Sequence, residues 1–182
     1  TGLYGLYFTT TNYIKVTDVL VQNTKDAGFL FDDADDVHVE GSIVLNAGGH
    51  SIAFSATTAP CNRVRVSSCY IYNGTLVGIL VNGAVGVVIM NNICNTLSSS
   101  GIDTNSSTSV VIDLNCCFEC TPGIWLEVAA KRVIISNNLI YSALGDKDGI
   151  VVVEAVDAAP IITNNFVEVT GIGITIKGPK AT

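Results

Sequence analysis

Apolar residues recur along the chain at every second position, in short runs separated by polar turns. The clearest copies are 87–96 (VVIMNNICNT), 133–142 (VIISNNLIYS) and 160–169 (PIITNNFVEV), where two asparagines interrupt two apolar runs. A period of two with β-branched side chains predicts strands, and no segment carries the sustained period near 3.6 that predicts a helix. Because an amide in an apolar run needs hydrogen-bond partners, the recurring pair indicates one structural unit used repeatedly.

The repeat extends over the whole chain. A dipeptide of Gly, or once Ser, followed by an apolar residue begins at positions 5, 28, 51, 78, 101, 123, 149 and 171, in steps of 22 to 27 residues. Two further columns follow it: Ile14, Val37, Val64, Val87, Val110, Val133 and Pro160, and then Val16, Val39, Val66, Ile89, Ile112, Ile135 and Ile162. The unit is too short for a strand–helix–strand crossover with long strands. It predicts an all-β fold, a right-handed single-stranded parallel β-helix of about seven to eight rungs stacked at about 4.8 Å.

One polar column accounts for the paired asparagines. Aligning the rungs places Asn92, Asn115, Asn138 and Asn165 together, with Ser42 and Cys69 at the equivalent place in earlier rungs. At a turn between strands, an inward Asn can bond the bent backbone and also the Asn of the next rung. We therefore expect an asparagine ladder that caps this corner.

The I-x-N-N-x-I…G-I pattern resembles the parallel β-helix repeat of the pectin lyase-like superfamily, from about Gly5 to Gly178. The superfamily includes pectinases, alginate-modifying enzymes, polysaccharide-cleaving phage tailspikes and non-catalytic stalk or adhesin domains. The resemblance implies the fold and, in general terms, a role with polysaccharides. The polygalacturonase motifs are not matched, because Asn-Thr-Asp is absent, His50 is not followed by Gly, and Arg63-Val64-Arg65 lacks the Lys. No catalytic residue carries over from the family.

Composition favours one domain over residues 1–182, because no linker divides the chain. The chain begins at Thr1 without Met or a signal peptide, which suggests a processed protein or an excised fragment. The net charge of −7 argues against nucleic acid as a partner. The most apolar run, 76–90, is shorter than the roughly 20 residues that span a bilayer and contains Gly and Asn, so we expect a strand and no membrane insertion.

Apolar residues make up 48% of the chain and charged residues only 14%, so some outward apolar area should be covered by a partner. Two outward columns qualify: Val88, Val111, Ile134 and Ile161, preceded by Lys15, His38 and Arg65, and the column Leu20, Ile43, Tyr70, Ile93, Cys116, Leu139 and Phe166. They predict a homo-oligomer, with a parallel trimer favoured. The alternatives are that loops or missing parts of the chain cover them, or that the phase is off by one residue.

The candidate binding site surrounds Trp125, the one tryptophan of the chain. Outward positions of the Gly-Ile strands place Trp125 and Glu127 beside Asp103 and Asn105, with Asn82 one rung earlier. An aromatic face rimmed by carboxylate and amide groups is typical of carbohydrate recognition. The candidate ligand-binding residues are therefore Trp125, Asn82 and Asn105.

Asp103 and Glu127 are also the candidate catalytic residues. One rung and two residues separate them, or roughly 8 Å by strand geometry, which lies within the ~6.5–9.5 Å of an inverting acid/base pair. The alternative is that both are solvated surface carboxylates and that Trp125 is an interface aromatic.

Other polar clusters favour structural roles. The run Asp32, Asp33, Asp35 and Asp36 offers carboxylates for Ca²⁺ but lacks the spacing of a known loop, so a solvated turn is expected. The two histidines, His38 and His50, are expected at surface or turn positions. We predict no metal site and no cofactor.

The six cysteines leave their pairing open. Cys94 and Cys117 should face inward on adjacent rungs, which permits a bridge, while Cys117–Cys120 and Cys61–Cys69 are rival pairings. The remaining alternative is that Cys69, Cys94 and Cys117 are buried free thiols. The cysteines therefore do not identify the compartment.

Three functional hypotheses follow. The leading one is an extracellular or virion-surface domain of a tailspike, stalk or adhesin that oligomerises and binds polysaccharide or cell-surface glycan through the Trp125 face. The second is a secreted polysaccharide hydrolase or lyase that uses Asp103 and Glu127. The third is a structural spacer without a ligand, since a rigid β-helix can separate other parts without any site.

Overall fold

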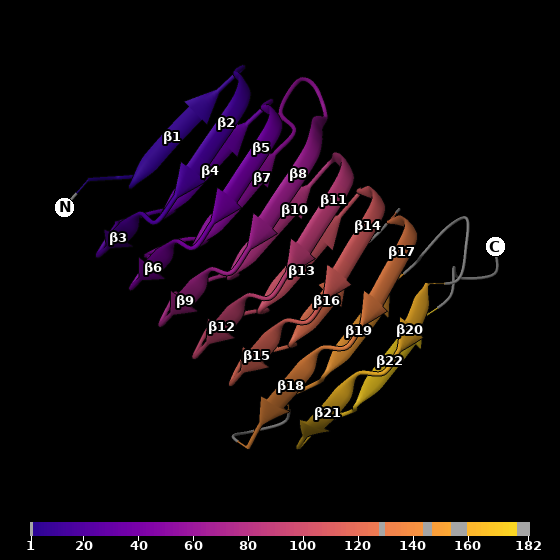
Figure 1. Cartoon of the computed structure of the whole chain (residues 1–182). Helices are drawn as coiled ribbons and strands as arrows, with labels where there is room; N and C mark the ends of the chain where they lie inside the picture. The colour runs from indigo at the N-terminus through magenta and orange to yellow at the C-terminus, as the bar shows by residue number, and fades with distance from the viewer. Residues whose placement is uncertain (1, 128–129, 144–146, 154–159, 178–182) are drawn as a thin grey trace.

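The computed structural model describes residues 2–127, 130–143, 147–153 and 160–177. Every regular element in these ranges is a strand, and the strands wind into a coil in which each rung adds one strand to each of three parallel sheets. Figure 1 shows the rungs stacked side by side, with β1 at one end of the coil and β22 at the other. The predicted parallel β-helix is confirmed.

Three sheets form the walls of the coil, and in each sheet the strands follow one another along the axis in chain order. Sheet A consists of β1 (Leu6–Thr9), β4 (Phe29–Asp32), β7 (Ile52–Ser55), β10 (Ile79–Asn82), β13 (Ile102–Asn105), β16 (Ile124–Leu126), β19 (Ile150–Val153) and β22 (Ile174–Lys177). Sheet B consists of β2 (Asn12–Thr17), β5 (Asp35–Glu40), β8 (Cys61–Ser67), β11 (Ala84–Met90), β14 (Thr108–Asp113), β17 (Lys131–Ser136) and β20 (Ile161–Thr163). Sheet C consists of β3 (Leu20–Gln22), β6 (Ile43–Leu45), β9 (Tyr70–Tyr72), β12 (Ile93–Asn95), β15 (Cys116–Phe118), β18 (Leu139–Ser142) and β21 (Phe166–Val169).

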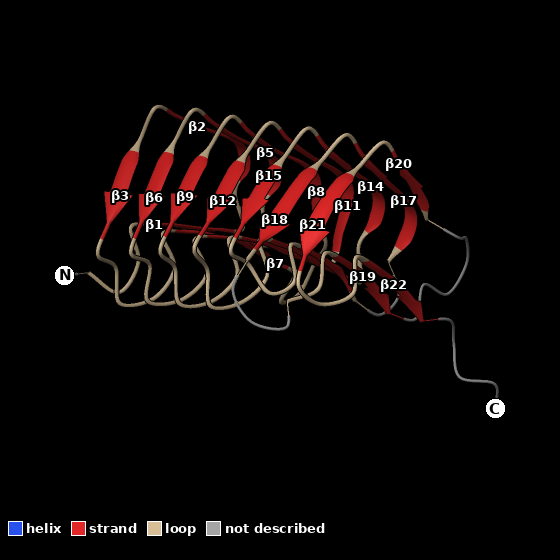
Figure 2. Cartoon of the chain, turned by 90° about the horizontal axis from the view of Figure 1, so that it is seen from below, coloured by secondary structure: helices blue, strands red, loops and turns tan. Residues whose placement is uncertain are grey.

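The strand register confirms the columns read from the sequence. Ile89 pairs with Ile112, and Ile112 pairs with Ile135, so these residues lie side by side in sheet B. All three are fully buried. Figure 2 shows the same winding from below, with the strands of sheet C along one wall of the coil.

Like side chains stack along the axis of the coil. Phe31 stacks on Phe8 and on Phe54, with ring centroids 5.5 and 4.9 Å apart. These rings occupy one inward column of sheet A, where Phe31 and Phe54 are fully buried. Because a parallel ladder sets each residue beside its counterpart in the next rung, repetition of the sequence pattern becomes continuous packing.

The predicted asparagine ladder lies at the corner between sheets B and C. The Asn92 side-chain amide donates to Asn115 Oδ1 at 3.0 Å, that of Asn115 donates to Asn138 Oδ1 at 3.0 Å, and that of Asn138 donates to Asn165 Oδ1 at 2.9 Å. Cys69 N donates to Asn92 Oδ1 at 3.0 Å, so the ladder also holds the preceding rung. Each of these amides therefore bonds both the backbone and the Asn of the next rung, and these hydrogen bonds offset the free-energy cost of burying a polar group.

The first residue of each Asn-Asn pair has a different role, which the sequence did not reveal. Asn91, Asn137 and Asn164 have φ of 56°, 55° and 54°, in the left-handed region. Asn tolerates this region better than most residues because its short polar side chain can bond the local backbone. The equivalent Leu114 has φ of 56° without that advantage. In each Asn-Asn pair the first Asn thus makes the turn and the second caps it.

The last rung departs from the prediction. Ile150 pairs with Ile174, so the last rung begins with Gly173-Ile174 and not with the expected Gly171-Ile172. The 24-residue step places Lys177 in the outward column of Val153.

Within the described ranges, no helix is long and apolar enough to cross a membrane.

Candidate functional site

The residues proposed from the sequence lie together on the outer face of sheet A. Asp103 in β13 pairs with Trp125 in β16, and Asn82 in β10 pairs with Asn105 in β13. Glu127 follows β16, and its backbone N donates to Thr104 O at 2.9 Å, which places Glu127 beside Asn105. Two adjacent outward columns result, one with Asp103 and Trp125 and the other with the two amides and Glu127.

Asp103 is buried, although its column points outward. Its exposed fraction is 7%, and its Oδ1 has no hydrogen-bond partner in the part of the chain that the structure describes. Burial and then the charge of Glu127 raise the pKa of Asp103 to about 7. The interpretation of Asp103 as a solvated carboxylate is therefore wrong, while Glu127 is half-buried.

Trp125 forms a wall of a pocket on the side of the later rungs. The pocket has a volume of about 190 Å³ and is lined by Pro122, Trp125, Asp148, Val151, Val153 and Lys177. Trp125 is half-buried, and its buried Nε1 has no hydrogen-bond partner among the described residues. A ring, three apolar side chains and two charged groups thus converge at one place on the outer face.

This arrangement suits two kinds of chemistry. An indole ring beside Pro122 and Val151 offers an apolar surface for the C–H face of a sugar, and the amides of Asn82 and Asn105 can bond hydroxyl groups. A carboxyl with a pKa near 7 also exchanges its proton at neutral pH, as a general acid must. Glu127 supplies a second carboxylate on the next rung, and its charge acts on Asp103.

Sequence reasoning missed most of the pocket. Val151 follows Trp125 in its column, and Lys177 follows Val153 in the other. The wrong register of the last rung concealed Lys177, whereas the repeated Ile-x-x-polar spacing from Ile124 to Glu127 and from Ile174 to Lys177 was a usable signal. Pro122 lies in the turn before β16, and Asp148 lies in the turn before β19. The rung between these two turns is longer than most, so the repeat alone does not predict their positions.

The acidic run of Asp32 to Asp36 joins two rungs. Asp33 accepts hydrogen bonds from Thr58 Oγ1 at 2.6 Å and from Ala59 N at 3.0 Å, and these bonds, the Thr58 hydroxyl first, lower its pKa to about 2. Asp36 forms an ion pair with Arg63, and Asp35 accepts from Asn62 N at 2.8 Å. The carboxylates therefore lie at the surface, as expected of a solvated turn, but they also bond the next rung, which the sequence did not predict. The described residues contain no group of three or more His, Cys, Asp or Glu that could hold a metal ion.

The cysteines are free thiols. Cys94 and Cys117 face inward on adjacent strands, as predicted, and both are buried. The Cys94 side chain and then burial raise the pKa of the Cys117 thiol. None of the proposed disulfides is present. Cys69, Cys94 and Cys117 are therefore buried free thiols, which was the remaining alternative.

The histidines lie at turn and outward positions, as expected: His50 lies in the turn between β6 and β7, and His38 lies in the outward column of sheet B. His50 is half-buried with its Nδ1 buried, and burial lowers its pKa. His38 is also half-buried, with its Nε2 lying 3.8 Å from the carboxylate of Glu40.

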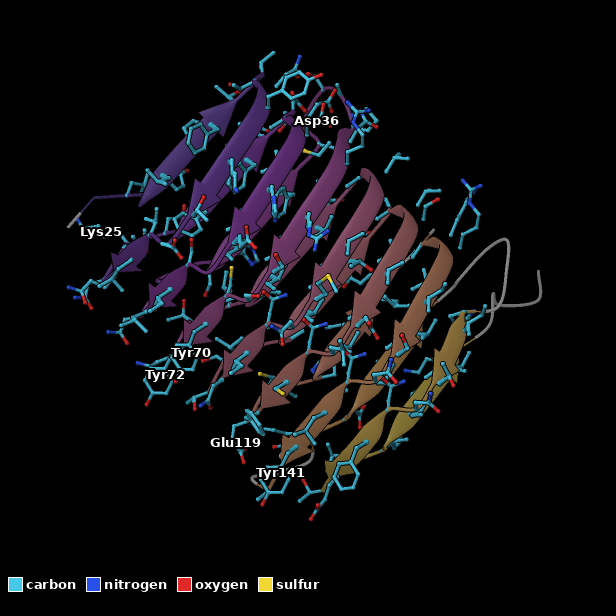
Figure 3. The ribbon with its side chains drawn as sticks, in the orientation of Figure 1. Lys25, Asp36, Tyr70, Tyr72, Glu119 and Tyr141 are labelled. Atoms are coloured by element: carbon cyan, nitrogen blue, oxygen red, sulfur yellow. The ribbon has the colours of Figure 1, made fainter. Side chains whose placement is uncertain are left out.

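A second outward surface covers sheet C, and we call it the sheet C face. Its first column is the predicted one, in which Leu20, Ile43, Tyr70, Ile93 and Phe166 are exposed. A second column, unforeseen, contains Gln22, Leu45, Tyr72, Asn95, Phe118, Tyr141 and Glu168. Tyr70 and Tyr72 stack with ring centroids 6.4 Å apart. Figure 3 shows Tyr70, Tyr72 and Tyr141 projecting from the same side of the coil.

Comparisons with known proteins support the fold. Residues 4–167 match the family model described as right handed beta helix region. No curated protein sequence matches the chain.

Three solved structures share the coil at low sequence identity. The A-module of the mannuronan C-5 epimerase AlgE6 of Azotobacter vinelandii has a TM-score of 0.70 and 14% identity, over 99% of this chain and 56% of that one. An alginate lyase from Paenibacillus has a TM-score of 0.67 and 16% identity, over 97% of this chain and 76% of that one. The surface protein and adhesin PfbA of Streptococcus pneumoniae has a TM-score of 0.59 and 10% identity, over 93% and 68%. The chain thus spans about half of the epimerase module.

Proposed function

Since the chain belongs to the right handed beta helix family, we propose that it binds polysaccharide through the outer face of sheet A around Trp125. The observation that carries the proposal is the pocket of about 190 Å³ whose wall is the single tryptophan of the chain. The volume lies below the ~300–1,000 Å³ of sites for drug-sized ligands, which is the scale of one sugar ring of a longer polymer. Asn82, Asn105 and Glu127 extend the polar side of this surface across earlier rungs.

The structural relatives support a role with glycans. They are an alginate lyase, a mannuronan epimerase and a surface adhesin, and two of these act on polysaccharides. At 14% and 16% identity the two enzymes share only the fold with this chain, so the support for a glycan ligand comes from the residues around Trp125.

The test is affinity electrophoresis of the chain through gels that contain a panel of soluble polysaccharides. At least one polysaccharide should retard the wild type, and Trp125→Ala should restore its mobility. Tyr7→Ala is the matched control, because Tyr7 is an exposed aromatic at the first rung of the Trp125 column. Equal retardation of the wild type and Trp125→Ala would show that any glycan binds elsewhere.

A second candidate function is polysaccharide cleavage. The observation that favours it is the near-neutral pKa of Asp103 beside Glu127, which suits Asp103 as general acid and Glu127 as base. The assay incubates the chain with the polysaccharides that it binds and measures reducing ends and unsaturated-product absorbance. Activity lost in both Asp103→Asn and Glu127→Gln supports cleavage, and no product with any bound polymer leaves binding alone.

The sheet C face supports self-association of the chain. Seven large apolar side chains, Leu20, Ile43, Tyr70, Tyr72, Ile93, Tyr141 and Phe166, are 37–58% exposed there. With areas on the order of 150–250 Å² each, they present roughly 600 Å² per copy, which approaches the ~800 Å² per partner of a standard interface. The chain then forms an oligomer, with a trimer favoured, as a spike, stalk or adhesin segment outside a cell or on a virion.

Light scattering tests the association. The wild type should have a multiple of the monomer mass, and Tyr72→Glu combined with Tyr141→Glu should reduce it to the monomer while circular dichroism stays unchanged. A monomeric wild type refutes the association and leaves the glycan proposal standing. Oligomers that bind no polysaccharide favour the spacer hypothesis.

A further inference from the structure

The outer face of sheet A carries an excess of negative charge. Its first column consists of Tyr7, Leu30, Ala53, Leu80, Asp103, Trp125, Val151 and Thr175. Its second column consists of Thr9, Asp32, Ser55, Asn82, Asn105, Glu127, Val153 and Lys177. Among these described positions, three carry carboxyl groups and Lys177 alone carries a cation. The pocket beside Trp125 adds a fourth carboxylate, that of Asp148.

Among the described residues, the other cations belong to different surfaces. Lys131 and Arg132 lie in β17 of sheet B, and Lys25 lies in the turn between β3 and β4. Lys15 and Arg65 are exposed in the outward column of sheet B. Arg63 is paired with Asp36, and the Lys147 ammonium lies 3.7 Å from Glu119 at the turn after sheet C. We call the outer face of sheet A together with the pocket beside Trp125 the Trp125 surface. Lys177 is the one described cation within it, and it lies two rungs after Glu127 in the same column.

This charge pattern discriminates between sugars. Carboxylates and amides accept hydrogen bonds from hydroxyl groups, and the amides of Asn82 and Asn105 also donate to them. A polymer with one carboxylate per sugar would place successive negative charges along a face that already carries Glu127 and Asp148, and like charges that meet in an interface disfavour binding. Recognition of a polyanion needs cations along the whole track, as Arg and Lys provide at phosphate and carboxylate sites.

We infer that the Trp125 surface takes an electrically neutral hexose polymer and rejects polyuronates. The inference rests on the proposed glycan-binding function and names the substrate class of that site. Trp125, Pro122 and Val151 contact the apolar faces of the sugars, Asn82, Asn105, Glu127 and Asp148 bond their hydroxyl groups, and Lys177 bonds one further oxygen as a donor.

The experiment compares matched oligosaccharides that differ only at C6. Hexamers of mannose, galactose and glucose are titrated against the hexamers of mannuronate, galacturonate and glucuronate with the same linkages, by calorimetry at pH 7.5 and low salt. In at least one pair the neutral member should bind at least tenfold more tightly. The difference should shrink at 0.5 M NaCl, because the screening length falls well below the ~10 Å that holds at 0.1 M.

A charge variant separates local from overall electrostatics. Glu127→Lys should increase the affinity for the preferred uronate hexamer by at least fivefold. Glu40→Lys makes the same change in net charge on the outer face of sheet B and should leave that affinity unchanged. An equal gain in both variants would contradict a local effect.

Failure of this inference is distinct from failure of the proposed function. If a uronate hexamer binds as tightly as its neutral partner or more tightly, and Trp125→Ala abolishes that binding, the glycan site stands and the neutral specificity is overturned. If no hexamer and no polysaccharide binds, the proposed function and this inference are both overturned.

Discussion

Replacing Asn115 should reveal how much stability the buried asparagine ladder supplies. Asn115 is fully buried. Its side-chain amide donates to Asn138 Oδ1, Ile89 O and Asp113 O, each at 3.0 Å. Its Oδ1 accepts from the backbone N and the side-chain amide of Asn92, both at 3.0 Å. Few single side chains in the described rungs connect so many groups.

The magnitude follows from these contacts. The amide supplies two N–H groups and two acceptor lone pairs, and each net hydrogen bond contributes about 0.5–1.5 kcal/mol. Asn115→Ala also leaves the buried N of Asn92 without its acceptor, which costs about 1–3 kcal/mol. These terms sum to about 3–9 kcal/mol, and since single substitutions rarely cost more than about 4–5 kcal/mol, the free energy of unfolding should fall by about 3–5 kcal/mol.

Urea unfolding, followed by Trp125 fluorescence and far-ultraviolet circular dichroism, measures this loss, and coincidence of the two probes checks that the transition is cooperative. Asn115→Ser should lose less, because Ser42 fills the same column by accepting from Val19 N and donating to Glu40 O. The matched control is Asn46→Gly. Asn46 bonds Asn23 and Asn73 in a second, exposed ladder, and Gly tolerates its φ of 54°.

The control should lose less than about 1 kcal/mol, because water replaces exposed hydrogen bonds. A loss below about 1 kcal/mol for Asn115→Ala, or equal losses at the buried and exposed ladders, would refute the reasoning that burial makes this column stabilising.

Three further predictions concern single residues. Gly78→Ala should lower the free energy of unfolding in urea by about 1–3 kcal/mol, because its Cβ would lie 2.5 Å from the carbonyl oxygen of Gly101. Leu114→Asn should raise the free energy of unfolding in urea by about 0.5–1 kcal/mol, because Leu114 is 50% exposed and has a left-handed φ that Asn adopts more readily. Asp103→Asn should stabilise the protein at pH 8.5 by on the order of 2–4 kcal/mol and change it little at pH 4, as measured by the melting temperature.

The sign of the last prediction follows from proton linkage. The folded-state pKa of Asp103, about 7, lies above its ordinary value of 3.8, so the folded protein keeps a proton that the unfolded chain releases. Stability must then fall as pH rises from about 4 to about 7, and Asn removes this loss. A wild type and an Asp103→Asn variant with parallel pH profiles would contradict the assigned pKa.

Controls for the other two predictions come from the same columns. Ser51 occupies the Gly78 column with a Cβ, so Ser51→Ala should keep full stability. Asn137 shares the turn position of Leu114, so Asn137→Leu should cost about what Leu114→Asn gains. Unchanged stability in Gly78→Ala would show that the turn relaxes around a methyl group, and a lower stability of Leu114→Asn would show that the apolar contacts of Leu114 outweigh the backbone strain.

The fold was predictable because the repeat makes side-chain identity periodic. Ile89, Ile112 and Ile135 lie in register because each rung must bury the same positions. The last rung was misplaced because two Gly-Ile pairs, at 171 and 173, compete there, and only the pairing of Ile150 with Ile174 decides between them. Local sequence alone does not choose between two equivalent dipeptides.

The sequence predicted which residues of the site lie together, but not how deeply each one is buried. Alternation along β13 and β16 placed Asp103 beside Trp125, since side chains at alternate positions share a face. Burial of Asp103 was not predictable, because it depends on which neighbouring side chains cover an outward position. The acidic run showed the same limit, since its partners, Thr58, Ala59 and Arg63, lie one rung later in the chain.

The most direct test of the glycan site uses the intrinsic fluorescence of Trp125, which reports on this one position because the chain has no other tryptophan. Titration with the neutral hexamer that calorimetry identifies as a ligand should change the emission in a saturable way, with the same dissociation constant, as sugar covers the indole. Emission that stays constant while calorimetry records binding would place the ligand away from sheet A and contradict the account.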